Sequence, residues 1–158
     1  DIQTDIQTDI FICQHSHNFF FKWNYAADIV TFNFTGQYNN YKARTQRDKT
    51  AWNLPNVRVS LYTDFKILPN LFTGIDLFYT GAREDLDYQI GSALPEKISL
   101  GGYLDLNFHI DYTFNKNWQV FLKANNLTTQ RYERWVYYPS QSIQAFAGIK
   151  YIFKLGDR

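Results

Sequence analysis

A strict two-residue alternation of apolar and polar side chains is the feature that most constrains how this chain can fold. It is clearest over residues 103–114. Successive side chains of a β-strand point to opposite faces, whereas an apolar helix face repeats every three to four residues. The even positions, which form the apolar face, are Leu104, Leu106, Phe108, Ile110, Tyr112 and Phe114. The odd positions, which form the polar face, are Tyr103, Asp105, Asn107, His109, Asp111 and Thr113.

The same alternation predicts about eight strands in all. Their short connections, at 26–28, 68–70 and 115–117, alternate with long ones at 42–55, 83–98 and 133–141. Short turns that alternate with longer loops are typical of outer-membrane barrels. We therefore predict an all-β fold, a transmembrane antiparallel up-and-down β-barrel that is part of a larger barrel. The predicted strands lie at 6–12, where the pattern is weakest, and at 19–25, 29–38, 57–67, 71–79, 103–114, 118–125 and 143–153.

Aromatic residues indicate which face of the barrel points outward. The chain has 12 Tyr, 14 Phe and 4 Trp, and many of them lie near both ends of the predicted strands. Such belts match the aromatic girdles of membrane barrels. A soluble ligand-binding barrel would instead pack its apolar face inward, and this alternative is disfavoured. With a net charge of +1, the chain has no basic field that would attract nucleic acid.

Several ordered segments resemble one family, the TonB-dependent outer-membrane receptors. The resemblance covers residues 28–153 and concerns the C-terminal portion of the β-barrel. Two departures are Thr128-Thr129 in place of the family's Phe-Asp, and the missing Gly-Arg after Pro139. The segments that carry the resemblance are Trp52-Asn53-Leu54-Pro55-Asn56, Tyr103-Leu104-Asp105-Leu106-Asn107, the run Val120–Leu127 with Tyr132 after it, and Tyr138-Pro139-Ser140-Gln141.

This resemblance implies a function as well as a fold. Such receptors are barrels of about 22 strands with a plugged lumen. They import iron chelates, cofactors such as cobalamin, or glycans across the outer membrane. The implied partners are outer-membrane lipid, the barrel-assembly machinery, the plug and remaining strands of the same receptor, and TonB through that plug. No catalytic residue, cofactor or metal is expected, and the chain is predicted not to be an enzyme.

A second hypothesis remains open at this point. Eight strands would be enough for a self-contained small barrel with a structural or adhesion role. In the division that we predict, residues 1–17 are an N-terminal segment or first strand, 18–153 are the barrel strands and 154–158 are a tail. The lack of Met and of a visible signal peptide at Asp1 favours a processed product or a piece of a longer protein.

Three groups of residues are candidate functional residues. The last strand resembles the C-terminal assembly signal of outer-membrane proteins, with Gly148, Tyr151 and Phe153 in the signal positions. A basic loop flanked by an aromatic residue could contact an anionic chelate or lipopolysaccharide. A second aromatic cluster could stack on a ligand at the barrel mouth. The residues of these two contact groups are Tyr41, Lys42, Arg44 and Arg47, and Trp135, Tyr137 and Tyr138.

Other sites are considered and set aside. His15 and His17 lie close to Cys13, but zinc requires three or four ligands, so we expect a polar loop there. The acidic run 83–87 lacks the glycine-centred spacing of a calcium loop and is expected to be a solvated loop. His109 shares a row with Asn107 and Asp111, which could assist a serine such as Ser60 or Ser99. A hydrogen-bonded network inside the barrel is the preferred interpretation of that row.

Overall fold

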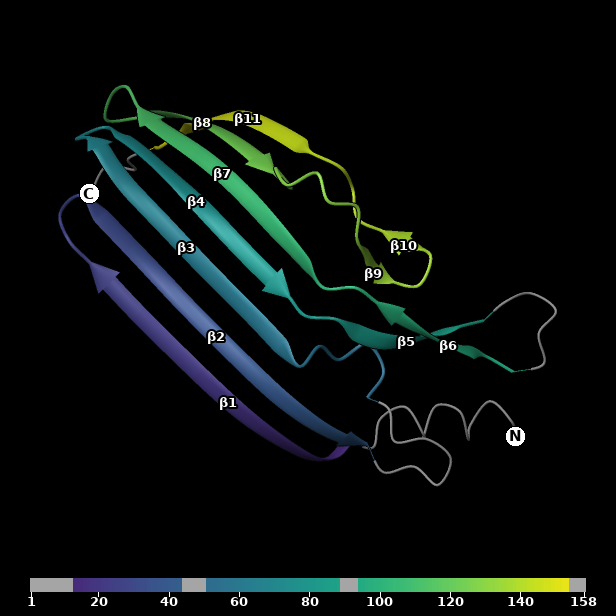
Figure 1. The fold of residues 1–158 in the computed structure, drawn as a ribbon. Coiled ribbons are helices and arrows are strands. Elements are labelled where there is room, and N and C mark those ends of the chain that lie inside the picture. Colours follow the sequence, from purple (N-terminus) through teal and green to yellow (C-terminus); the bar gives the residue numbers. More distant parts are fainter. Residues whose placement is uncertain (1–12, 44–50, 89–93, 154–158) are drawn as a thin grey trace.

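The computed structural model describes residues 13–43, 51–88 and 94–153, and this part of the chain contains strands and connections without any helix. Seven long strands form one antiparallel sheet in the order β1-β2-β3-β4-β7-β8-β11 (Figure 1). Seven predicted strands are thereby confirmed, and the predicted strand at 6–12 lies outside the described residues. The seven are β1 (Cys13–Ala26), β2 (Val30–Ala43), β3 (Val57–Leu68), β4 (Leu71–Thr80), β7 (Tyr103–Thr113), β8 (Trp118–Asn125) and β11 (Gln144–Tyr151).

Short and long connections leave opposite ends of this sheet, as predicted. The tight turns lie between β1 and β2, β3 and β4, and β7 and β8 (Figure 1). The predicted long connections at 83–98 and 133–141 each contain a short antiparallel hairpin, which the alternation did not predict. These hairpins are β5 (Arg83–Asp87) with β6 (Glu96–Leu100), and β9 (Glu133–Trp135) with β10 (Tyr138–Pro139).

Two boundaries also differ from the prediction, because backbone pairing continues beyond the side-chain alternation. His15 and His17 lie in β1, in register with Lys42 and Asn40 of β2, and not in a polar loop. Strand β2 itself runs to Ala43, so Lys42 belongs to a strand end and not to a loop. No group of three or more metal-ligating side chains occurs in the described part of the chain.

The register gives the sheet one apolar and one polar face. Leu106 of β7 lies opposite Leu77 of β4, while the next residues in line, Asp105 and Phe78, share the other face. Nothing in the described residues covers the apolar face: Phe19 is 70% and Ile149 67% exposed. The buried apolar side chains among the described residues are Leu100, Tyr132 and Pro55, so the sheet encloses no water-excluding core of its own. This arrangement is that of a membrane barrel, whose apolar face points outward.

Aromatic rings on this apolar face contact one another close to the short turns. Trp23 meets Phe32 edge to face with ring centroids 4.9 Å apart, next to the β1–β2 turn. Trp118 and Tyr151 are 4.6 Å apart, next to the β7–β8 turn. Such pairs add about 0.5–1.5 kcal/mol each beyond their area of burial. They also form the belt that the sequence predicted at this end.

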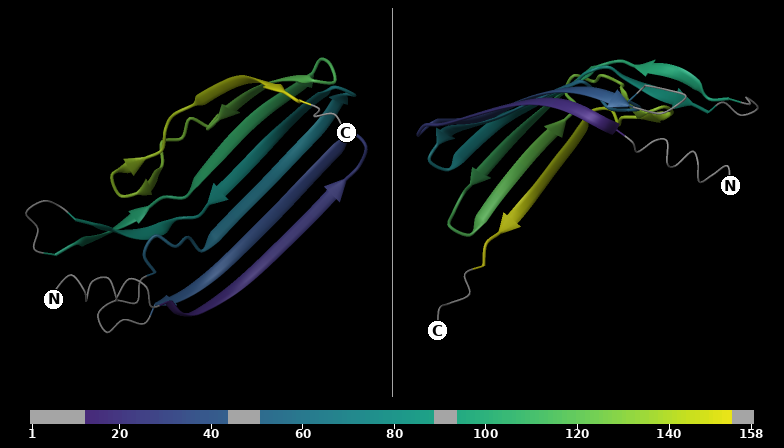
Figure 2. Two further views of the ribbon diagram at one scale, coloured as in Figure 1. Left: turned by 180° about the vertical axis from the view of Figure 1, so that it is seen from behind. Right: turned by 90° about the horizontal axis from the view of Figure 1, so that it is seen from below.

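The sheet is curved but open. Its two edges within the described residues are β1 and β11, and Figure 2 shows them on opposite sides of the curved sheet. The described strands therefore form part of a barrel wall and do not form a closed barrel. Among the same residues, no helix is long and apolar enough to cross a membrane.

Candidate functional site

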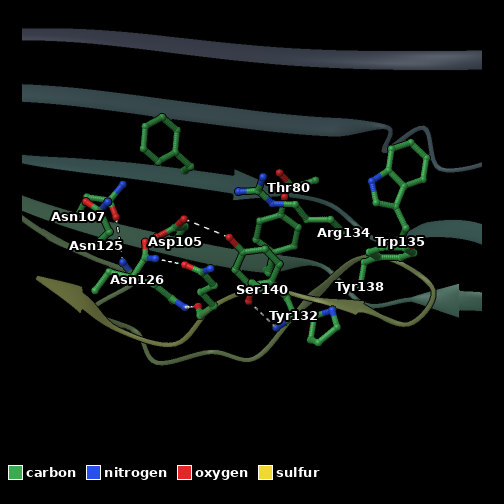
Figure 3. Close-up of a pocket in the computed structure, with 15 residues that line it drawn as sticks. Thr80, Asp105, Asn107, Asn125, Asn126, Tyr132, Arg134, Trp135, Tyr138 and Ser140 are labelled. Atoms are coloured by element: carbon green, nitrogen blue, oxygen red, sulfur yellow. Dashed lines mark hydrogen bonds between the residues drawn. The ribbon is translucent and has the colours of Figure 1, made fainter.

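A large cavity lies on the polar face, at the end of the sheet where the long connections leave it. Its volume is about 810 Å³. One wall is the start of β7 together with the ends of β4 and β8, and the opposite wall is the segment 132–141 (Figure 3). The residues that matter most for its chemistry are Asp105, Asn107, Asn126, Tyr132, Trp135 and Tyr138.

Asn126 lines this cavity directly after β8. It follows β8 with φ of 52° and is only 5% exposed. Its backbone N–H donates to Asn107 Oδ1 at 3.0 Å, and its side-chain Nδ2 donates to the carbonyl of Gln141 at 2.8 Å. Asparagine tolerates this left-handed conformation better than most residues. The chain therefore bends directly after β8.

Two tyrosines from the opposite walls of the cavity meet. The rings of Tyr103 and Tyr132 are parallel, with centroids 3.6 Å apart. The Tyr132 hydroxyl donates to Asp105 Oδ2 at 3.2 Å, whereas Asp105 Oδ1 is buried without a hydrogen-bond partner. Burial, with the neighbouring Asp105 carboxylate, raises the pKa of Tyr132 above its ordinary value of 10.0. Tyr132 is therefore a neutral donor at physiological pH.

Of the three aromatic residues that were predicted to contact a ligand, two line the cavity and one does not. Trp135 and Tyr138 line the cavity, at 58% and 70% exposed. We call these two residues the aromatic ledge. Tyr137 does not line it, because its hydroxyl donates to Asp87 Oδ1 at 2.7 Å on the neighbouring hairpin. That hydrogen bond is the main reason why the pKa of Tyr137 is raised.

Arg83, whose role was not predicted from the sequence, joins three long connections. Arg83 is 6% exposed, and its Nε donates to Asn53 Oδ1 at 2.5 Å. Its Nη2 donates to the carbonyl oxygens of Glu133 and Arg134, the latter at 3.0 Å. Its guanidinium also lies 5.5 Å from the centre of the Tyr103 ring. The run that begins at Arg83 is thus a strand with specific contacts and not the solvated loop that was predicted.

The predicted basic group is not brought into this cavity. Tyr41 lines a smaller hollow of about 230 Å³ together with Leu54, Glu84 and Ser99. Lys42 is the penultimate residue of β2, and Arg44 and Arg47 lie outside the described residues. The proposal that these four residues contact an anionic ligand or lipopolysaccharide remains a prediction.

The predicted assembly residues lie on or just after the edge strand β11. Gly148 pairs with Phe121 of β8, whose ring fills the space that a side chain at position 148 would occupy. The rings of Tyr151 and Phe153 are 4.5 Å apart, and Phe153 is 78% exposed. Their role as a signal for the barrel-assembly machinery also remains a prediction.

His109 belongs to a network that crosses strands. Its Nε2 lies 3.0 Å from Asp64 Oδ1 on β3, and its Nδ1 lies 4.0 Å from Asp76 Oδ2 on β4. The carboxylates that it approaches are therefore on other strands, and the row with Asn107 and Asp111 on its own strand does not provide them. The preferred interpretation, a polar network on the inner face, is confirmed.

Comparison with known proteins places this architecture in a family. Residues 5–127 match the family described as TonB dependent receptor-like, beta-barrel. No curated protein is detectably similar in sequence.

The fold is shared with several solved outer-membrane receptors. The pyoverdine outer membrane receptor of Pseudomonas aeruginosa has 16% identity and a TM-score of 0.75, over 87% of this chain and 21% of the receptor. The siderophore receptor PiuA of Acinetobacter baumannii has 18% identity and a TM-score of 0.61, over 86% and 20%. The ferric-catecholate import receptor of Escherichia coli has 17% identity and a TM-score of 0.59, over 78% and 18%. The chain thus spans about a fifth of the length of these receptors.

Proposed function

The chain belongs to the TonB-dependent receptor-like β-barrel family, and we propose that it forms the C-terminal barrel wall of a receptor that imports a chelate, cofactor or glycan. As a member of this family it lies in the outer membrane, with strands as its membrane-crossing elements. The observation that carries the proposal is the cavity on the polar face, where the aromatic ledge stands beside hydrogen-bonding side chains. Pockets that combine ring faces with a few fixed polar groups are typical binding sites.

A ferric chelate is the first cargo that we would test. The solved receptors with this fold support that choice, because they include a pyoverdine receptor, a siderophore receptor and a ferric-catecholate import receptor. In this proposal the remaining barrel strands and the plug complete the binding site. TonB acts through the plug and supplies the energy for import.

Iron uptake in cells tests this function. Bacteria that lack this receptor, and the same cells complemented with it, would be given radioactive iron bound to pyoverdine or to a catecholate. We expect uptake only in complemented cells, and no uptake when TonB is also deleted. The double variant Trp135→Ala with Tyr138→Ala should weaken uptake at low chelate concentration. Tyr88→Ala is the matched control, because Tyr88 is 60% exposed and does not line the cavity. Equal uptake with and without the receptor, for both chelates, would reject a ferric cargo.

The open edges of the sheet weigh against a self-contained structural or adhesion barrel. Edge strands carry unpaired backbone groups, which a membrane cannot satisfy. The test is refolding into detergent micelles followed by gel mobility with and without heating. A compact, heat-modifiable monomer would favour the small closed barrel. Aggregation would favour the larger receptor.

A further inference from the structure

We propose that β5 is a positioning strand for the aromatic ledge, and that Arg83, Asp85 and Asp87 fix the ledge beside the cavity. This inference rests on the proposed function, because it assumes that the ledge contacts cargo. It assigns a role to three residues that do not themselves line the cavity beside the ledge. They act through the β9–β10 hairpin, which they hold in place by hydrogen bonds.

Arg83, Asp85 and Asp87 contact successive residues of the β9–β10 hairpin, in the same order as they occur in the chain. They occupy alternate positions of β5, so their side chains share one side of the strand. Arg83 donates to the carbonyl oxygens of residues 133 and 134. Asp85 Oδ2 accepts from the Val136 N–H at 3.1 Å, and Asp87 Oδ1 accepts from the Tyr137 hydroxyl at 2.7 Å. Each successive anchor therefore meets a later residue of the segment 133–137.

The positioning strand is itself held in place. Five residue pairs join β5 to β6. Asn53 Oδ1 accepts a hydrogen bond from Arg83 Nε. The Asn53 Nδ2 donates to the carbonyl of Arg134 at 3.1 Å. The Asn53 N–H donates to the carbonyl of Glu84 at 2.6 Å. The anchors thus belong to a connected group that includes the segment before β3, so they can resist displacement of the hairpin.

The anchors explain how exposed rings can stay ordered. The two ledge residues are more than half exposed, so apolar packing contributes little to holding them. Tyr137, between them, has φ of 66°, which is unfavourable for a residue with a large side chain. Such a conformation persists only where surrounding contacts enforce it. A ledge fixed in advance also avoids part of the ordering cost of binding, so its loss should weaken affinity more than the maximal import rate.

Amide hydrogen exchange tests the positioning without any cargo. The receptor would be purified from outer membranes in detergent, and exchange would be followed in the peptide that contains residues 133–138. Losing the acceptor at Asp85 should speed exchange of the Val136 amide by about tenfold or more. The test variants are Asp85→Ala, Asp87→Ala and Arg83→Ala. The matched control is Glu84→Ala, because Glu84 lies between the anchors and its carboxylate faces Lys97 at 3.9 Å. Equal exchange in the anchor variants and the control would overturn the proposal.

A double-mutant cycle tests whether Asp87 acts through Tyr137. We expect Tyr137→Phe and Asp87→Ala each to speed exchange in the hairpin, and the combined variant to be no faster than either one. Additive effects would mean that the two residues act independently, which contradicts the proposed role of Asp87.

Cellular uptake of iron-loaded pyoverdine separates this inference from the proposed function. In the anchor variants we expect the half-saturating concentration to rise about fivefold or more, with an unchanged maximal rate. Arg83→Lys should recover only part of the loss, because an ammonium cannot reproduce the planar fork. An unchanged half-saturating concentration despite faster exchange would overturn the positioning role. If the unmodified receptor takes up no pyoverdine iron, that choice of cargo fails, while the exchange results still decide whether β5 holds the ledge.

Discussion

His109 Nε2 lies 3.0 Å from Asp64 Oδ1, although β4 separates the strands that carry these two residues. Gly74 of β4 lies between them in the pairing, opposite both Asp64 and His109. A methyl group at Gly74 would be 2.3 Å from His109 Cε1 and 2.2 Å from the Thr63 carbonyl oxygen. Because glycine has no side chain, Gly74 leaves room for His109 to contact Asp64 across β4.

Gly74→Ala should destabilise the sheet by about 2 kcal/mol or more, because the new methyl group meets backbone as well as the imidazole. Unfolding by urea in detergent micelles would measure the loss. Gly36→Ala is the control on β2, where the nearest atom to the added carbon is 3.5 Å away. A similar loss at both positions would show that glycine conformational effects, and not the crowding at Gly74, are responsible.

Asn126 can be tested by separating its backbone conformation from its side-chain hydrogen bonds. Asn126→Ala should cost about 2 kcal/mol or more, since it loses the hydrogen bond to Gln141 and places alanine at a positive φ. Asn126→Gly should cost about 1 kcal/mol less than alanine, because glycine adopts this conformation freely. The same urea titration measures both. A glycine variant that is as unstable as alanine would contradict the role of the left-handed conformation.

Ionisation of Tyr137 should be delayed relative to that of ordinary tyrosines. Its pKa is raised above 10.0, chiefly by the hydrogen bond to Asp87. A raised pKa means that the folded state favours the neutral phenol, so the contribution of this bond is present below pH 10.0 and is lost as pH rises through the folded-state pKa. The absorbance titration of wild type minus that of Tyr137→Phe should isolate one late phenol. In an Asp87→Ala background that phenol should titrate earlier, and an unshifted titration there would exclude Asp87 as the cause.

Phe153→Ala should lower the amount of receptor assembled in the outer membrane without lowering the stability of the refolded protein. Phe153 is 78% exposed, and its ring contact is with Tyr151, so little folding energy depends on it. Quantitative blotting of outer membranes would measure assembly, and urea unfolding would measure stability. Ile152→Ala is a neighbouring control at a position that the signal pattern leaves open. Equal yields for wild type and both variants would reject the assembly signal.

The sequence predicts the long strands well, because each strand has lipid on one face and water on the other. The resulting alternation of apolar and polar residues can be recognised within a single strand. The bend at Asn126 suits this residue type, since Asn tolerates a positive φ. The partner of His109 was not predictable from its row, because the contact runs across strands over Gly74. Alternate residues along one strand share a face, but they do not reveal which side chains reach them from other strands.

The hairpin anchors were missed for a different reason. Arg83 lies some fifty residues before the carbonyl groups that it holds, so no local pattern contains both partners. The run was interpreted as a solvated loop because it is strongly charged. Its alternate placement of Arg83, Asp85 and Asp87 was nevertheless a period-two signal, and it could have indicated a short strand with one functional side.

The open sheet restricts the number of strands that a complete barrel can contain. Because each of its neighbouring strands is antiparallel, the first and the seventh strands in the order, β1 and β11, run in the same direction. Direct pairing of these two would therefore be parallel, whereas single-chain bacterial outer-membrane barrels have an even number of antiparallel strands. Closure in that style requires an odd number of additional strands between β11 and β1.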